Sequence, residues 1–168
     1  MTDQVISVRR LEEADAEAYR TLRLEALAMS PESFASTFEA ESAEPLEWFA
    51  ERLQRNAVFG AFRAADLVGI AGFFAHAGAK QRHKGVLWGM YVRPAASGVG
   101  IGRLLGESVI EHARRQVELL QLQVVSTNEP ALRLYAGLGF SRYGLERRGL
   151  KDRDRYFDEV LMVKVLDE

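Results

Sequence analysis

The sequence contains no cysteine, which excludes disulfide bonds, thiolate metal sites and a cysteine nucleophile. It also lacks an excess of charge of one sign, because 22 basic and 24 acidic side chains leave a formal net charge of −2. No long Lys/Arg run or base-reading motif occurs, so we expect no nucleic-acid partner. The longest weakly charged run, residues 67–79, is interrupted by glycine and shorter than the ~20 residues that span a bilayer. We therefore expect no membrane partner.

Secretory signals contain an apolar region near the N-terminus, and the first ten residues show none, so we expect a cytoplasmic protein. The 168 residues are 48% hydrophobic and 27% charged, which is ordinary for a globular protein of this length. No repeat, low-complexity stretch or linker interrupts the chain. We expect residues 1–168 to form a single domain.

The hydrophobic pattern changes along the chain between the period of a strand and that of a helix, which predicts a mixed α/β domain. Residues 30–42 are polar and irregular, and residues 149–155 form a charged loop between two final strands. Ser126 and Glu129 have the spacing of a helix capping box. We expect strands over 5–8, 57–63, 67–75, 86–92, 120–124, 140–147 and 156–165. We expect helices over 12–29 and 46–53, a third from the glycine turn to 117, and a fourth from the capping box at Ser126 to 138.

The most informative stretch is a glycine-spaced turn, 97–102, which connects a strand ending at 90–92 to an amphipathic helix. Backbone N–H groups converge in such a turn beside the positive end of the helix dipole, which favours an anion such as a phosphate. Glycine suits these positions because a Cβ would block the anion and disfavour positive φ. The plain alternative is a glycine-rich turn that binds nothing.

The spacing of the glycines separates several classes of phosphate site. Gly98, Gly100 and Gly102 alternate by two, whereas the dinucleotide fingerprint requires G-x-G-x-x-G. A Walker A loop requires a Gly-Lys pair before a hydroxyl residue, and the sequence has none. Neither a Rossmann dinucleotide site nor a nucleoside triphosphatase is favoured.

Two segments of the sequence resemble motifs of the GNAT acetyltransferases. Tyr91-Val92-Arg93-Pro94, followed by the turn 97–102, is similar to the segment on which this family binds acetyl-CoA. Residues 128–140, from Asn128 to Phe140, resemble the family's Asn-x-x-A-x-x-L-Y-x-x-x-G-F element. The resemblance implies a largely antiparallel central sheet flanked by helices, in the order β-α-α-β-β-β-α-β-α-β-β.

The resemblance also implies where acetyl-CoA binds. In the family, the pantetheine arm lies along the strand that ends at 90–92, and the pyrophosphate lies on the amides of 98–103. Asn128 corresponds to a side chain that touches the arm, and Tyr135 to a tyrosine near the sulfur. The implied cofactor residues are Met90, Tyr91, Val92, Ser97, Gly98, Val99, Gly100, Ile101, Gly102, Arg103, Asn128 and Tyr135, with no metal.

Acetyl transfer to an amine requires a neutral amine, a donor for the developing oxyanion and a proton for the departing thiolate. Tyr135 is the expected acid, and a backbone N–H near Met90 is the expected oxyanion donor. Two departures from the family stand out. Ser97 replaces the usual Arg or Gln, and Trp88 and Gln123 occupy strand positions where many relatives place a carboxylate base.

The base is therefore unassigned from the sequence. His83 is the preferred candidate because a free imidazole titrates near neutral pH, and a water chain is an equal alternative. The other candidates are His76, Glu25, Asp158 and Glu159.

The sequence is compatible with three functions. The first is acetyl transfer from acetyl-CoA to a primary amine of a small molecule, peptide or protein. The second is a catalytically silent acetyl-CoA-binding module, and the third is a binder of another phosphate ligand. The fold does not select the acceptor, and a homodimer is an expectation that the resemblance adds.

Overall fold

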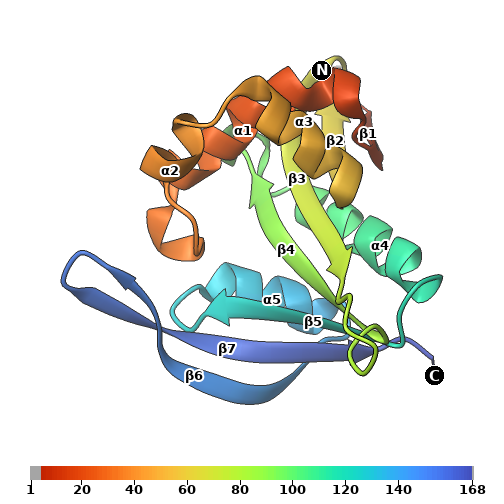
Figure 1. Cartoon of the computed structure of the whole chain (residues 1–168), viewed down its shortest axis with the longest axis vertical. Coiled ribbons are helices and arrows are strands. Elements are labelled where there is room, and N and C mark those ends of the chain that lie inside the picture. Colours follow the sequence, from red (N-terminus) through yellow and green to blue (C-terminus); the bar gives the residue numbers. More distant parts are fainter. Residues whose placement is uncertain (1–4, 168) are drawn as a thin grey trace.

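The computed structural model describes residues 5–167, in which one seven-stranded sheet is flanked by helices on both faces (Figure 1). The strands and helices alternate in the order that the resemblance implies, with one additional short helix. In chain order the elements are β1 (Ile6–Arg10), α1 (Ala16–Met29), α2 (Phe38–Ser42), α3 (Leu46–Arg55), β2 (Ala57–Arg63), β3 (Asp66–Ala75), β4 (Lys84–Val92), α4 (Ile101–Arg114), β5 (Leu119–Val125), α5 (Glu129–Gly137), β6 (Ser141–Asp152) and β7 (Arg155–Val165).

The strands lie in the order β1-β2-β3-β4-β5-β7-β6, and every neighbouring pair is antiparallel except β4 with β5. The parallel pair is short, running only from Lys84 opposite Leu119 to Val86 opposite Gln121. Beyond this point β4 and β5 diverge, as Figure 1 shows. The edge of β4 that faces β5 is therefore free to bind another extended chain through its backbone.

A β-bulge lies in the free half of β4. Between the pairs Gly72 with Trp88 and Ile70 with Tyr91, one residue of β3 faces two residues of β4. Gly89 in the bulge has a φ of 66°, a conformation that favours glycine. The bulge re-aims the backbone groups immediately before Tyr91.

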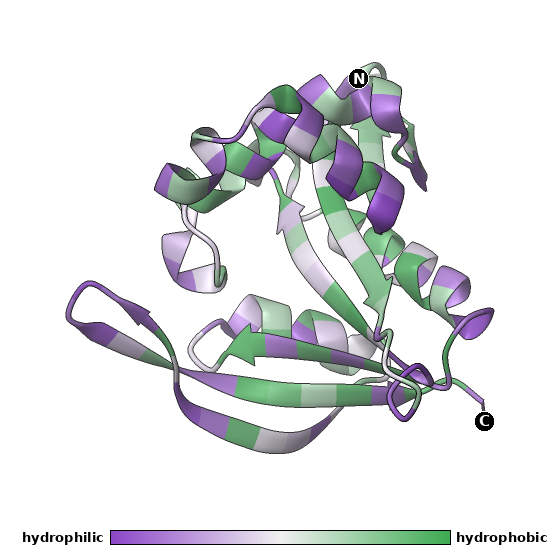
Figure 2. Ribbon diagram, in the orientation of Figure 1, coloured by the Kyte–Doolittle hydropathy of each residue, from purple (hydrophilic) through white to green (hydrophobic). Residues whose placement is uncertain are grey.

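Two cores form on opposite faces of the sheet. Leu22 of α1 and Phe49 of α3 pack on one face, and Leu105 of α4 and Leu132 of α5 pack on the other. In Figure 2 the central strands are mainly green, whereas the end of the β6–β7 hairpin is purple. Within the described residues, no helix is long and apolar enough to cross a membrane.

The segment 30–42 is more ordered than its composition predicts. Pro31–Ser33 forms a 3-10 turn, and α2 follows with Thr37 as its N-cap, whose Oγ1 accepts a hydrogen bond of 3.1 Å from the amide of Ala40. A helix this short has no repeating apolar face, so the periodicity that identifies longer helices does not reveal it.

Two further predictions need correction. Ser126 does not cap α5: its amide donates to the carbonyl of Asp158 on β7, and Asn128 is the N-cap, accepting from the amide of Ala131 at 3.3 Å. The predicted loop 149–155 is mostly strand, because β6 and β7 remain paired up to Asp152 opposite Arg155. Cross-strand contacts that single-sequence patterns do not contain stabilise this charged hairpin.

Candidate functional site

The glycine turn has the conformation that its sequence predicts. Gly98 and Gly100 have φ values of 85° and 84°, and α4 begins directly after Gly100. No atom lies within 4 Å of a Cβ built at either glycine, so positive φ rather than crowding is what requires glycine here. The amides of the first turn of α4 have no partner within the helix and are available to an anion.

Ser97 has a local role in this turn. Its Oγ donates a hydrogen bond of 2.8 Å to the carbonyl of Pro94, which closes the turn before the glycines. The hydroxyl proton is therefore used within the loop, and the oxygen of Ser97 is left as an acceptor. Ser97 therefore stabilises the conformation of the turn.

A groove of about 480 Å³ begins at this turn and continues along the free end of β4; we call it the β4–α4 groove. It contains the predicted cofactor residues with the exception of Val99 and Tyr135. Val99 points into solvent, with 61% of its surface exposed. The lining residues are Ser30, Ser33, Phe34, Met90, Tyr91, Val92, Pro94, Ser97, Gly98, Gly100, Ile101, Gly102, Arg103, Asn128, Pro130, Ala131 and Leu134.

Tyr135 lies on α5 within the core that α4 and α5 share, and only 6% of its surface is exposed. Its ring contacts Phe140 edge to face, with centroids 5.9 Å apart. Burial raises the pKa of the Tyr135 phenol above its ordinary range. The raised pKa keeps the phenol protonated, and no hydrogen bond with another described residue uses its proton.

Glu25 is the one candidate base on α1, and it is already engaged. Its Oε2 accepts from the hydroxyl of Tyr91 at 3.0 Å and from Nε of Arg93 at 3.2 Å. Burial and the hydrogen bond to Glu25 raise the pKa of Tyr91 to about 12. Glu25 therefore connects α1 to the end of β4 beside the groove.

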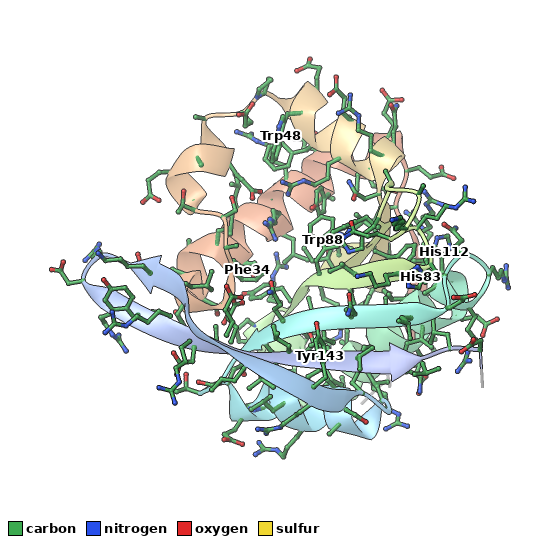
Figure 3. The ribbon with its side chains drawn as sticks, turned by 60° about the horizontal axis from the view of Figure 1, so that its bottom comes forward. Phe34, Trp48, His83, Trp88, His112 and Tyr143 are labelled. Carbon is green, nitrogen blue, oxygen red and sulfur yellow. The ribbon has the colours of Figure 1, made fainter. Side chains whose placement is uncertain are left out.

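The structure does not bring the two candidate histidines to the β4–α4 groove. His83 immediately precedes β4, and its carbonyl accepts from the amides of Glu118 and Leu119. Seven residues of extended chain separate His83 from Met90, which corresponds to about 23 Å. His76 lies at the same end of the sheet, because its amide bonds to the carbonyl of Lys84. Figure 3 shows His83 well away from Phe34, which lines the groove.

A buried ion cluster lies on the α1 and α3 side of β4, and the sequence reasoning missed it. Glu41 accepts from Nε and Nη2 of Arg23 at 3.0 and 2.8 Å and from Nη1 of Arg52 at 3.1 Å. Both guanidinium groups also lie over the ring of Trp88. Burial alone raises the pKa of Glu41, but hydrogen bonds from Arg23 and Ser36 and the two positive charges outweigh it and hold the pKa at about 2.

A second pocket, of about 380 Å³, lies between the segment 27–39 and the β6–β7 hairpin; we call it the α2–hairpin pocket. Phe34 lines both this pocket and the β4–α4 groove, so the two cavities adjoin at this residue. Figure 1 shows the hairpin reaching beneath this segment. The pocket also contains Lys151 and Phe157 from the hairpin.

The remaining candidate carboxylates lie on β7. Asp158 accepts a hydrogen bond of 2.8 Å from the amide of Arg148. Glu159 is 8% exposed, and burial together with Glu146 opposite raises its pKa. Gln123 donates to Glu146 at 3.3 Å, so the position where relatives carry a carboxylate is connected here to an acidic pair.

Comparison with known proteins agrees with this fold and groove. The model of the acetyltransferase (GNAT) family matches residues 15–140. The mycothiol acetyltransferase of Thermomonospora curvata is 34% identical over 146 residues, which are 84% of this chain and 46% of that protein. The N-alpha-acetyltransferase RimI of Mycobacterium tuberculosis is 31% identical over 85% of this chain and 83% of its own.

A solved structure of an acetyltransferase has the same fold as this chain. The ribosomal-protein-alanine N-acetyltransferase of Brucella melitensis superposes with a TM-score of 0.81 and 28% identity, covering 95% of this chain and 99% of its own. The chain spans about half the length of the mycothiol acetyltransferases that it matches. The family match and the RimI relative together show that this chain belongs to the GNAT acetyltransferase family.

Proposed function

We propose that this chain transfers an acetyl group from acetyl-CoA to a primary amine. The observation that carries the proposal is the glycine turn, whose open amides over 98–103 lie at one end of the β4–α4 groove. The free edge of β4 continues from that turn to the bulge at Gly89. An anion-binding turn followed by an unpaired strand edge fits a long ligand with a pyrophosphate and an amide-containing arm.

The groove residues fit this ligand in chemical detail. Asn128 uses its side-chain oxygen to cap α5, which leaves its amide N–H groups to donate into the groove that it lines. Backbone N–H groups at the bulge beside Met90 supply the donor for a developing oxyanion. When bound, acetyl-CoA supplies the activated acetyl group.

Tyr135 is the proposed acid for the departing thiolate. Its phenol is protonated across the physiological pH range because burial raises its pKa. The hydroxyl proton is not used in a hydrogen bond with another described residue. Both properties suit a group that donates a proton at the end of a reaction.

The acceptor is proposed to enter through the α2–hairpin pocket, because that pocket meets the β4–α4 groove at Phe34. One relative is named a mycothiol acetyltransferase and another an N-alpha-acetyltransferase. We therefore propose an amine-bearing small molecule, peptide or protein as the acceptor. Location in the cytoplasm and a homodimeric state stay predictions.

Native mass spectrometry with coenzyme A, acetyl-CoA and adenosine nucleotides tests the binding half of the proposal. Selective retention of coenzyme A is expected, and equal retention of nucleotides would contradict it. The transfer half is tested by thiol release from acetyl-CoA with a panel of amines: an alanine-initiated peptide, amino acids, polyamines and amino sugars. Binding without turnover of any amine would favour the catalytically silent module.

A further inference from the structure

Glu159 on β7 is a buried residue whose carboxyl has no counter-charge among the described residues. Its surface is 8% exposed, and among the described residues no hydrogen bond or ion pair acts on its carboxyl, whose pKa responds only to burial and to Glu146. The residue directly opposite on β6 is Glu146, a second carboxyl. A buried carboxylate beside a like charge is unfavourable unless a cation joins it, so the pair points to a positively charged ligand.

The register of the sheet places Glu159 on the face that carries the α2–hairpin pocket, next to that pocket's lining residue Phe157 rather than in the lining itself. Residues paired across strands, and residues two apart along a strand, share one face, so Glu159 lies on the same face as Phe157, which lines the α2–hairpin pocket. On its other side Glu159 pairs with Val125 at the end of β5. The turn Pro31–Ser33 packs against β5 and β6, and the same turn reaches the β4–α4 groove through Ser33.

Within the described part of the chain, no positively charged side chain is paired with the carboxyl of Glu159. From β5 it meets Val125, and the amide of Gln123 is bonded to Glu146. On β6, the guanidinium of Arg148 lies over the ring of Tyr156, 4.6 Å from its centroid. The other titratable groups on the packed elements are Glu146 and the exposed Arg147 on β6, Glu32 on the turn and Lys151 farther along the hairpin.

We propose that Glu159 binds the ammonium group of the acceptor and removes its proton, an inference that rests on the proposed acetyl transfer. One N–H bond of the ammonium breaks, an O–H bond forms on Glu159, and the electron pair remains on nitrogen. That pair forms the C–N bond to the acetyl carbon as the C–S bond breaks, and the sulfur takes a proton while the nitrogen loses one. Glu159 then returns its proton to water.

The assignment explains why Trp88 and Gln123 are tolerated at positions where relatives carry a carboxylate. Burial and the charge of Glu146 raise the pKa of Glu159, which is the direction that a proton acceptor requires. Glu25 is bonded to two donors and His83 lies at the other end of β4, so neither is free for this role at the groove.

The kinetic test compares Glu159→Gln and Glu146→Gln with the wild type, using the amine of the panel that shows the highest turnover. Glu159→Gln is expected to lower kcat/KM by about 10²- to 10⁴-fold. It is also expected to abolish the acid limb of the pH profile, which is the decrease of kcat/KM at low pH. Glu146→Gln is expected to move that limb to lower pH, because the neighbouring negative charge is gone. Glu118→Gln, an exposed change at the other end of β5, serves as the control with unchanged kinetics.

A second readout does not depend on turnover. In protein saturated with coenzyme A, carbon-13 NMR of labelled glutamate carboxyls follows the titration of Glu159, identified by its loss in Glu159→Gln. Butylammonium is expected to shift this titration to lower pH, whereas butan-1-ol is not. The inference would be overturned if butylammonium did not shift the titration of Glu159. It would also be overturned if Glu159→Gln and the wild type had the same pH dependence of kcat/KM.

The two readouts separate failure of this inference from failure of the proposed function. If no amine in the panel is acetylated, the proposed transfer fails, and the butylammonium titration alone decides whether Glu159 binds a cation. If the wild type turns over an amine and Glu159→Gln equals it, the proposed transfer stands and the role of Glu159 is refuted. Coenzyme A binding is expected to be the same in all four proteins.

Discussion

Glu41→Gln removes the negative charge at the centre of the buried ion cluster and leaves Arg23 and Arg52 without a counter-ion. In the folded chain the pKa of Glu41 is about 2, against an ordinary value of 4.5, which corresponds to roughly 3 kcal/mol of stabilisation of the ionised folded state. Because the side chains of Glu41 and Arg23 are only 3% and 6% exposed, solvent does little to reduce this figure. Removing one partner of a buried pair typically costs about 3–5 kcal/mol, which agrees in size.

Thermal unfolding measures this effect directly. For a chain of this length about 1 kcal/mol corresponds to roughly 2–4 °C, so Glu41→Gln is expected to lower the Tm by roughly 6–20 °C. Glu47→Gln, on the exposed surface of α3, is the matched control and is expected to change stability by less than about 0.5 kcal/mol. Equal Tm values for the two variants would refute the idea that the cluster stabilises the fold.

The pH dependence of stability provides a second check on the same cluster. The folded pKa of Glu41 lies below the unfolded one, so the unfolded chain binds more protons between them. The contribution is therefore fully present above pH 4.5 and is lost as the pH falls toward 2. Urea unfolding at a series of pH values is expected to show this loss in the wild type and a shallower one in Glu41→Gln.

Three further changes test the groove and the bulge. Gly100→Ala, at a φ of 84°, is expected to weaken coenzyme A binding about 10-fold in calorimetry, since positive φ costs a non-glycine residue roughly 1–2 kcal/mol, whereas Gly78→Ala in the loop before β4 is not. Tyr135→Phe is expected to lower kcat at least about 10-fold while Tm and coenzyme A affinity stay unchanged, because the hydroxyl has no partner to lose; an unchanged kcat across pH would contradict its role as the acid. Gly72→Ala places a Cβ 2.5 Å from Cε2 of Trp88 and is expected to cost about 1–3 kcal/mol in urea unfolding, so a neutral result would contradict the tight packing of that indole.

Most of the sheet and the long helices could be predicted from the sequence. β2 and α1 follow patterns that repeat within a few residues, because the spacing of apolar side chains is set by the local geometry of each element. α2 escaped prediction because five residues are too few to show a helical period. The outer half of the β6–β7 hairpin escaped because its charged residues are stabilised across the strands.

The phosphate side of the candidate site was also predictable. Gly98 and Gly100 require positive φ for reasons local to the turn, and the strand before the turn and the helix after it are regular. The proton-transfer side was not predictable in the same way. His83 is close in sequence to β4 but lies at the wrong end of it, whereas Glu159 is far in sequence and adjacent to the end of β5.

The sequence by itself determined the class of the domain, the anion-binding turn and the family, because dihedral preferences and hydrophobic periods are properties of short segments. Only the tertiary structure decided which charges are buried. Glu41 lies in an acidic stretch of the sequence, between Glu39 and Glu44, yet packing of α1, α2 and α3 encloses it between two arginines. Burial and the pairing of like charges at Glu159 depend on contacts between distant segments, and these contacts decide which carboxyl is left without a partner.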